Sequence, residues 1–293
     1  MSELAKRVAF GVVAAPVALA IVFAGGAPLA GLLAIASAIA AWEFYRIARA
    51  AGHAPFADLG AALAGIVPLA VHATYLGLLQ PRYSYYAAVL LFLLGLSIWA
   101  RGANGKPLGA VAVTVLGVLY TGGLLSFGYA IRYHDYAVGG VSLGSIPIAA
   151  GGILLGLPLV LTWATDTGAY FVGRSVGGRK LIPAVSPGKT VSGAIGGVVT
   201  SVLVTWLYVT FLLRPSAQLA MTTASIIVFG IVVSVAAQIG DLVESLLKRE
   251  AGVKDSGALL PGHGGVLDRL DSLFFVLPTA HLLLGWLLIP APR

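Results

Sequence analysis

Residues 240–271 concentrate side chains that bind cations and phosphates in a chain that is otherwise apolar. Six carboxylates lie within these 32 residues: Asp241, Glu244, Glu250, Asp255, Asp268 and Asp271. The accompanying cations are Lys248, Arg249, Lys254 and Arg269. Carboxylates bind hard cations, and Lys and Arg bind phosphate groups. The segment therefore predicts a site for a metal ion and a polyphosphate at the edge of a membrane.

The first group of these residues has helical spacing. Asp241, Glu244, Ser245 and Lys248 follow at i, i+3, i+4 and i+7, which places them on one face of a helix. A carboxylate near the end of an apolar helix is costly unless it meets a cation or a water-filled cavity. An ion pair with Lys248, one turn away, is the alternative role for Glu244. No cation lies one turn from Asp241, so we expect Asp241 to bind metal.

The second group opens the last apolar run. Asp268 and Asp271 are three residues apart, and acidic residues at a helix start can simply be caps, which is the alternative for both. Two helix ends with paired carboxylates could instead share one Mg²⁺ or two cations, because Mg²⁺ takes only one or two protein carboxylates. Between the groups, Pro261 to Gly265 predict a tight turn whose His263 could contact a phosphate, act as an acid or cap the turn.

A second polar segment follows the sixth apolar run. Asp166 closes that run and Arg174 follows it, although topology or anionic lipid could explain the arginine. Ser186, Lys189 and Thr190 precede the seventh run and predict an anion site at a helix N-terminus. The Gly-Lys-Thr sequence is not a P-loop, because Pro183 occupies the position of the required glycine and no strand is expected before it.

Composition indicates the fold class. The chain has 293 residues, of which 59% are hydrophobic, and its mean hydropathy is +0.96. Continuous apolar runs long enough to span a bilayer predict an all-α polytopic membrane protein and disfavour a β-barrel. The absence of cysteine excludes disulfides and thiolate metal sites. The formal net charge of +7 resides in short loops, where membrane topology explains it and no nucleic-acid partner is needed.

We expect about nine transmembrane helices. They are predicted at 8–24, 27–44, 57–79, 84–100, 108–130, 146–171, 191–213, 220–247 and 272–290. With the N-terminus in the cytoplasm and the C-terminus outside, 14 of the Lys and Arg residues are cytoplasmic and 4 are not, as the positive-inside bias requires. No signal-peptide cleavage site is evident after the first run, so we expect that helix to be retained.

This topology predicts a division of labour along the chain. Residues 1–145, with spans 1–5, are expected to be a scaffold that contacts lipid or forms a homodimer surface. Residues 146–293, with spans 6–9, are expected to be catalytic, with cytoplasmic loops at 172–190 and 248–271. The site would then face the cytoplasm at the inner membrane.

The run from Ser245 to Asp271 resembles the signature of phosphatidate cytidylyltransferases, also called CDP-diglyceride synthases. It reads S-x-L-K-R-x4-K-D-x-G-x2-L-P-x-H-G-G-V-x-D-R-L-D without a mismatch. Gly240-Asp241-Leu242, Glu244, the D-x-G-A-Y-x-x-G-R segment from Asp166 and the S-P-x-K-T segment from Ser186 also resemble this family. The strong resemblance covers about 160 to 275, and one departure is Val191-Ser192 where the family usually has Trp-Glu.

The resemblance implies transfer of CMP from CTP to phosphatidic acid, with Mg²⁺, to give CDP-diacylglycerol and pyrophosphate. We assign metal binding to Asp241 and Asp268, supported by Glu244 and Asp271. Catalytic contacts to phosphate are expected from Lys248, Arg249, His263 and Arg269. Substrate binding is expected from Ser186, Lys189, Thr190, Ser245, Lys254, Asp166 and Arg174.

Two alternatives of function stay open from sequence. A cytidylyltransferase acting on an archaeal-type diether lipid is the nearest, because of the Val191-Ser192 departure. An ion-coupled transporter belongs to another class, but its pathway should carry polar residues along the full length of the spans, whereas here they gather at one membrane face. A pure lipid-binding scaffold would leave the carboxylates unexplained.

Overall fold

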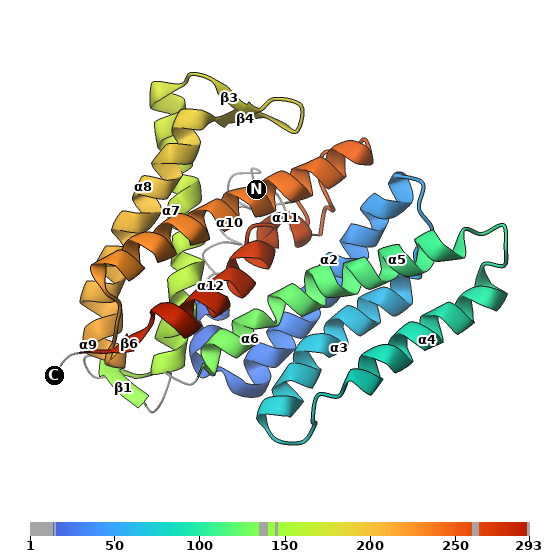
Figure 1. Cartoon of the computed structure of the whole chain (residues 1–293), viewed down its shortest axis with the longest axis horizontal. Helices are drawn as coiled ribbons and strands as arrows, with labels where there is room; N and C mark the ends of the chain where they lie inside the picture. Colours follow the sequence, from blue (N-terminus) through green and yellow to red (C-terminus); the bar gives the residue numbers. More distant parts are fainter. Residues whose placement is uncertain (1–13, 15, 135–139, 144–145, 260–263, 292–293) are drawn as a thin grey trace, which may run out of the picture. The chain divides into compact units, whose positions relative to one another are not determined.

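The computed structural model describes residues 14, 16–134, 140–143, 146–259 and 264–291 (Figure 1). Within them, eight helical segments are long and apolar enough to cross a membrane. They are Gly26–Ala50, Ala57–Tyr75, Tyr83–Ala100, Pro107–Arg132, Ala150–Val176, Val191–Ala217, Thr223–Glu250 and Leu267–Leu287. The predicted all-α polytopic fold is confirmed, and each of these segments matches one of the predicted spans 2–9. Much of the first predicted span lies outside the described residues, although 16–24 are helical.

The chain divides into two compact units that do not follow the sequence linearly. The first unit contains 1–14, 26–126 and 247–269, and the second contains 15–25, 127–246 and 270–293. Residues 247–269, expected within the C-terminal half, therefore pack with N-terminal helices. The expected roles of residues 1–145 as scaffold and of residues 146–293 as catalytic region stay predictions.

The first unit is built from α2 (Gly26–Ala50), α3 (Ala57–Tyr75), α4 (Tyr83–Ala100), α5 (Pro107–Gly117) and the π-helical η1 (Val118–Gly123). The buried Tyr45 of α2 organises its core. Its Oη donates a 2.6 Å hydrogen bond to the carbonyl of Thr114, and its ring occupies the space that a side chain at Gly60 or Gly117 would need. Small residues thus let these helices approach closely, as is common in lipid.

The second unit contains most of the other helices, two short hairpins and one pair of short strands that are distant in sequence. Its helices are α6 (Phe127–Arg132), α7 (Ala150–Val176), α8 (Val191–Tyr208), η2 (Val209–Leu213), α9 (Arg214–Ala217), most of α10 (Thr223–Glu250) and α12 (Leu273–Leu287). Its antiparallel strand pairs are β1 (Gly140–Leu143) with β2 (Ile146–Ala149), β3 (Lys180–Ile182) with β4 (Ser186–Thr190), and β5 (Leu219–Ala220) with β6 (Ile289–Pro290). The short α11 (Leu267–Leu270) carries the boundary between the units.

Glycines set the close packing of α7 against α8. A Cβ at Gly196 would lie 2.5 Å from Cβ of Val172, and a Cβ at Gly193 would lie 2.8 Å from the carbonyl oxygen of Ala169. Real side-chain atoms do not approach this closely, so α7 and α8 require glycine at these positions. This packing brings the C-terminal end of α7 beside the N-terminal end of α8.

Several helix ends differ from the approximate predicted bounds by a few residues, and those of the sixth span bear on the site. The sixth span begins at Ala150 rather than 146, because 146–149 pair with β1, and it continues to Val176. Gly177 and Gly178 then end α7 with φ values of +65° and +95°, a conformation that glycine adopts readily. The loop expected at 172–190 is therefore shorter, and it contains the β3–β4 hairpin where no strand was expected.

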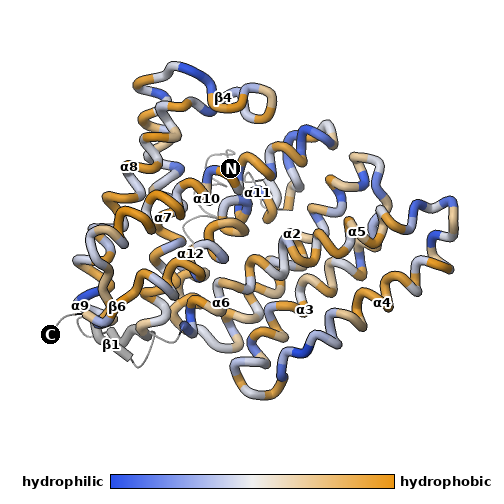
Figure 2. The backbone as a smooth tube through the Cα atoms, in the orientation of Figure 1, coloured by the Kyte–Doolittle hydropathy of each residue, from blue (hydrophilic) through white to orange (hydrophobic). Residues whose placement is uncertain are grey.

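The hydropathy of the residues changes between the helices and the segments that join them. Apolar residues line most of their length, and polar residues gather at the β3–β4 hairpin and at several helix ends (Figure 2). The outward side chains of α4 are themselves large and apolar, as Leu91 and Trp99 are 67% and 83% exposed. Such a surface suits hydrocarbon rather than water, which agrees with an integral membrane protein.

Candidate active site

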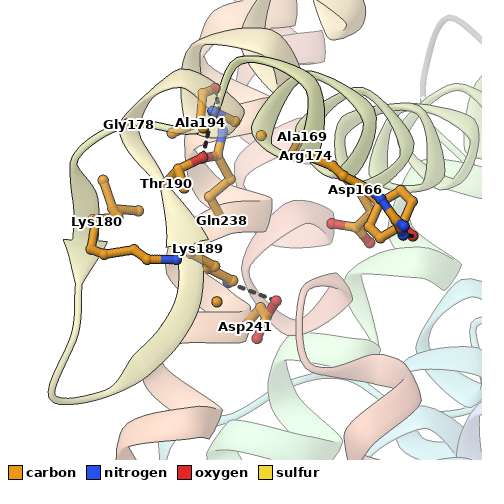
Figure 3. Close-up of a pocket in the computed structure, with 16 residues that line it drawn as sticks. Asp166, Ala169, Arg174, Gly178, Lys180, Lys189, Thr190, Ala194, Gln238 and Asp241 are labelled. Carbon is orange, nitrogen blue, oxygen red and sulfur yellow. Dashed lines mark hydrogen bonds and ion pairs between the residues drawn. The ribbon is translucent and has the colours of Figure 1, made fainter.

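A cavity of about 740 Å³ lies in the second unit, between α7, the β3–β4 hairpin, α8 and α10. Glycines and short side chains form much of its wall, and charged or polar side chains supply the rest. The latter are Asp166, Tyr170, Arg174, Lys180, Lys189, Thr190, Gln238 and Asp241. Figure 3 shows Lys189 on the hairpin pointing at Asp241 on α10, with Asp166 and Arg174 on α7 lining the same cavity.

The hairpin is tied to the start of α8. The Thr190 side chain caps α8 by accepting a 3.1 Å hydrogen bond from the Gly193 amide, and Ser192 Oγ donates to the carbonyl of Gly177. Lys180 pairs with Thr190 across the strands. The cap and the strand pairing both fix the backbone at Thr190, the residue after Lys189, so the long side chain of Lys189 starts from a defined position.

Lys189 and Asp241 form an ion pair. The Nζ atom of Lys189 lies 2.6 Å from Oδ2 of Asp241, and both side chains are about a third exposed or less. The other oxygen, Oδ1, lies 3.3 Å from Ser245 Oγ, one turn further along α10. The structure thus brings together three predicted site residues, of which two had been assigned to substrate and one to metal.

Asp241 also belongs to a group of three carboxylates. It interacts electrostatically with Asp166 of α7 and with Asp271, and the latter two interact with each other. Asp271 Oδ1 additionally accepts a hydrogen bond from the Ser272 amide, a local bond of the kind that capping provides. In the described part of the chain, no three His, Asp or Glu side chains are close enough to enclose a metal by themselves. The group therefore offers a cation one or two protein ligands.

The first unit holds a second charged arrangement around Asp268. Lys248 Nζ lies 2.8 Å from Asp268 Oδ1, and the amides of Ser256 and Gly265 donate to the same carboxylate at 3.1 and 2.9 Å. The side chains of Lys248 and Asp268 are only 13% and 8% exposed. Asp268 thereby ties Ser256 and Gly265 to the start of α11. The metal site that Asp241 and Asp268 were expected to share stays a prediction.

Comparison with known proteins identifies the family of this chain. The cytidylyltransferase family model matches residues 5–287. The chain belongs to the cytidylyltransferase family. The expected resemblance is thus confirmed, the chain is a nucleotidyltransferase, and the transporter alternative is set aside.

Relatives of this cytidylyltransferase match either nearly the whole chain or a part of it. Phosphatidate cytidylyltransferase of Bacillus subtilis is 33% identical over 294 residues, which is 97% of this chain and 99% of the relative. Phosphatidate cytidylyltransferase of Staphylococcus epidermidis is 49% identical over 125 residues, covering 43% and 46% of the two chains. The uncharacterized protein YnbB of Escherichia coli is 34% identical over 230 residues, covering 74% and 75%.

Most of the other predicted site residues of the cytidylyltransferase fall within the described part of the chain. Glu244 is buried, at 1% exposure, on α10. Ser186 begins β4, and Arg174 donates to Tyr170 Oη at 2.8 Å. Arg174 is exposed, and so are Arg249, Lys254 and Arg269. His263 lies outside the described residues. The roles assigned to all of these stay predictions.

Two residues of interest were not predicted as part of the cytidylyltransferase site. Gln238 lines the cavity and lies one turn before Asp241 on α10, a spacing that could have indicated it. Lys180, from the same polar segment as Arg174, also lines the cavity. Glu43 of α2 is completely buried and accepts hydrogen bonds from Ser256 and from Leu267 at the start of α11. A carboxylate within a membrane helix is a signal in itself, because a charged group there is costly.

Proposed function

We propose that this cytidylyltransferase transfers CMP from CTP to phosphatidic acid at the cavity between α7, the β3–β4 hairpin and α10. The observation that carries the proposal is the Lys189–Asp241 pair in a cavity lined by both cations and carboxylates. The family match over 5–287 and the names of the relatives support the same reaction.

The reaction needs electrostatic help more than proton transfer. A phosphate oxygen of phosphatidic acid attacks the α-phosphorus of CTP, the bond from that phosphorus to the β-phosphate oxygen breaks, and pyrophosphate leaves with the bond electrons. The nucleophile is already an anion, so a general base is hardly required. The barrier arises because an anion approaches a polyanion, which fixed cations and a metal can neutralise.

The cavity supplies cations for this purpose. Lys189, Lys180 and Arg174 line it, and the first of these is already held at a carboxylate by a short contact. Lys189 would contact the phosphates of CTP, and Ser245 beside Asp241 adds a hydroxyl donor. Lys248, Arg249 and Arg269 stay the further phosphate contacts expected from the sequence.

The carboxylates fit a role in holding Mg²⁺. Three acidic side chains interact at Asp241, and Mg²⁺ prefers oxygen ligands while drawing most of its shell from phosphate and water. Two of these side chains, Asp241 and Asp271, would hold the ion, and Asp166 would add negative charge beside them. Metal binding by Asp268, expected from the signature, stays a prediction. When bound, Mg²⁺ would neutralise phosphate charge and stabilise the leaving pyrophosphate.

The membrane setting follows from the two substrates. The acyl chains of phosphatidic acid stay in the bilayer while CTP arrives from water, so we place the cavity at the cytoplasmic face, where positive segments attract the nucleotide.

A direct test uses purified protein in lipid nanodiscs with labelled CTP, phosphatidic acid and Mg²⁺. We expect CDP-lipid and pyrophosphate in equal amounts, and little product with ATP. Parallel reactions with an unsaturated diether lipid phosphate decide the acceptor. Product from the diether lipid alone would replace phosphatidic acid in the proposal, and no product from either lipid would refute it.

A further inference from the structure

Glu43 is the buried acidic residue in the first unit that the proposed reaction does not yet use. It lies on α2, and its side chain is 0% exposed. Burying a carboxylate costs several kcal/mol unless hydrogen bonds replace those of water. The hydrogen-bond partners of Glu43 therefore indicate its role.

Those partners are Ser256, in the loop before α11, and Leu267, the first residue of α11. Glu43 Oε2 accepts a 2.7 Å hydrogen bond from the amide of Leu267 and a 3.2 Å hydrogen bond from Ser256 Oγ. Leu267 directly precedes Asp268 in the chain. Ser256 is shared, because its amide also donates to Asp268 at 3.1 Å. Glu43 therefore bonds both to the residue just before Asp268 and to a residue whose amide donates to the Asp268 carboxylate.

Close packing also restricts the space around the Glu43 side chain. A Cβ at Gly257 would overlap Oε1, and a Cβ at Gly265 would overlap both Ser256 Oγ and Glu43 Oε2. The loop therefore needs glycine on each side of this contact. The same Gly265 donates its amide to Asp268, so close packing on Glu43 and ordering of Asp268 occur at one residue.

We propose that Glu43 is a positioning residue of the transferase, which acts through Ser256 and Leu267 to hold Asp268 against Lys248. The Lys248–Asp268 contact of 2.8 Å is the arrangement that it would maintain. The inference rests on the proposed function, since Lys248 and Asp268 are predicted site residues. It also gives α2, in the half of the sequence expected to be scaffold, a part in catalysis.

The test compares Glu43→Ala, Glu43→Gln and Ser256→Ala with a control, Tyr45→Phe. Tyr45 lies two residues from Glu43 on α2. The variant Tyr45→Phe loses a buried hydrogen bond to the carbonyl of Thr114, which is not part of the Glu43 contacts. For each purified protein, kcat, the unfolding temperature and the rise in unfolding temperature with added Mg²⁺ would be measured.

We expect Glu43→Ala to lower kcat by about 10- to 100-fold, the usual effect of removing a group that orients a site residue. Glu43→Gln keeps an acceptor oxygen, so its kcat should stay close to that of the unmodified protein. Ser256→Ala removes one of the two contacts, so its kcat should fall by less than that of Glu43→Ala. Glu43→Ala combined with Ser256→Ala should be no slower than Glu43→Ala alone, because both act along one path. Glu43→Ala and Ser256→Ala should also weaken the stabilisation by Mg²⁺, whereas Tyr45→Phe should lower only the unfolding temperature.

A folded Glu43→Ala protein with unchanged kcat and Mg²⁺ response would overturn the inference. If Glu43→Ala does not fold, Ser256→Ala decides: wild-type kcat and Mg²⁺ response in that variant reject it, and a partial loss of both supports it. Absence of activity in the unmodified protein would instead refute the proposed function, and in that case the Mg²⁺ response of the unfolding temperature still tests Glu43.

Discussion

The Lys189 ammonium lies 2.6 Å from Oδ2 of Asp241, joining the β3–β4 hairpin to α10. The two residues are 52 positions apart in sequence and were assigned to different ligands. Their pairing means that one residue's charge is balanced by the other before any substrate arrives. A phosphate and a metal ion entering together would supply each of them with a new partner of opposite charge.

Exchanging the charges tests this relationship. Lys189→Met and Asp241→Asn should each lower kcat by at least about 100-fold, as loss of a preorganised electrostatic contact typically does. The double exchange Lys189→Asp with Asp241→Lys keeps an ion pair but places each charge opposite the wrong ligand. We expect it to restore the unfolding temperature without restoring turnover. Recovered turnover would show that the pair is only structural.

Removal of metal tests the carboxylates. Chelation with EDTA should abolish product formation, and added Mg²⁺ should restore it.

Asp241→Asn and Asp268→Asn should remove turnover while the proteins still fold, because the amide binds Mg²⁺ poorly and keeps the shape of the side chain. Asp58→Asn, an exposed acidic residue on α3, is the matched control and should stay fully active. Near-normal turnover by either site variant would remove that residue from the metal assignment.

The helix cap at Thr190 links stability to activity. Thr190→Val keeps the side-chain shape but loses the bond to the Gly193 amide, so the free energy of unfolding should fall by about 1 kcal/mol. Activity should fall too, since the cap fixes the residue next to Lys189. Thr74→Val removes a hydroxyl that bonds only to the Ala70 carbonyl within α3, and its activity should not change. Equal activity of Thr190→Val and Thr74→Val would argue against a role of the cap in the site.

The contact between α7 and α8 predicts a steric effect. Gly196→Ala would place its Cβ 2.5 Å from Cβ of Val172, and the overlap should destabilise the protein by about 1–3 kcal/mol. The matched control is Gly95→Ala in α4, where a Cβ meets nothing within 4 Å and alanine favours the helix. Thermal unfolding in detergent should rank the proteins as Gly95→Ala at or above wild type and Gly196→Ala below it. Equal unfolding temperatures would contradict the close packing.

The helices themselves were predictable because a bilayer imposes a simple requirement. An apolar run must be about 20 residues long to cross it, and turns at residues such as Arg101 to Pro107 are polar. Predicted span 84–100 therefore matches α4 at Tyr83–Ala100 closely. The end of α7 was less predictable, because polar residues such as Arg174 can extend a helix beyond the apolar run until Gly177 ends it.

The site was predictable as a set of residues and not as an arrangement. The sequence by itself determined the membrane class, the residue types for phosphate and metal, and the family signature from Ser245 to Asp271, since these depend on composition and spacing along one chain. Only the tertiary structure decided that Lys189 meets Asp241, that Asp166 and Asp271 interact with it, and that Glu43 holds the loop before Asp268. Such contacts join residues up to 224 positions apart, and helix packing rather than local spacing brings them together.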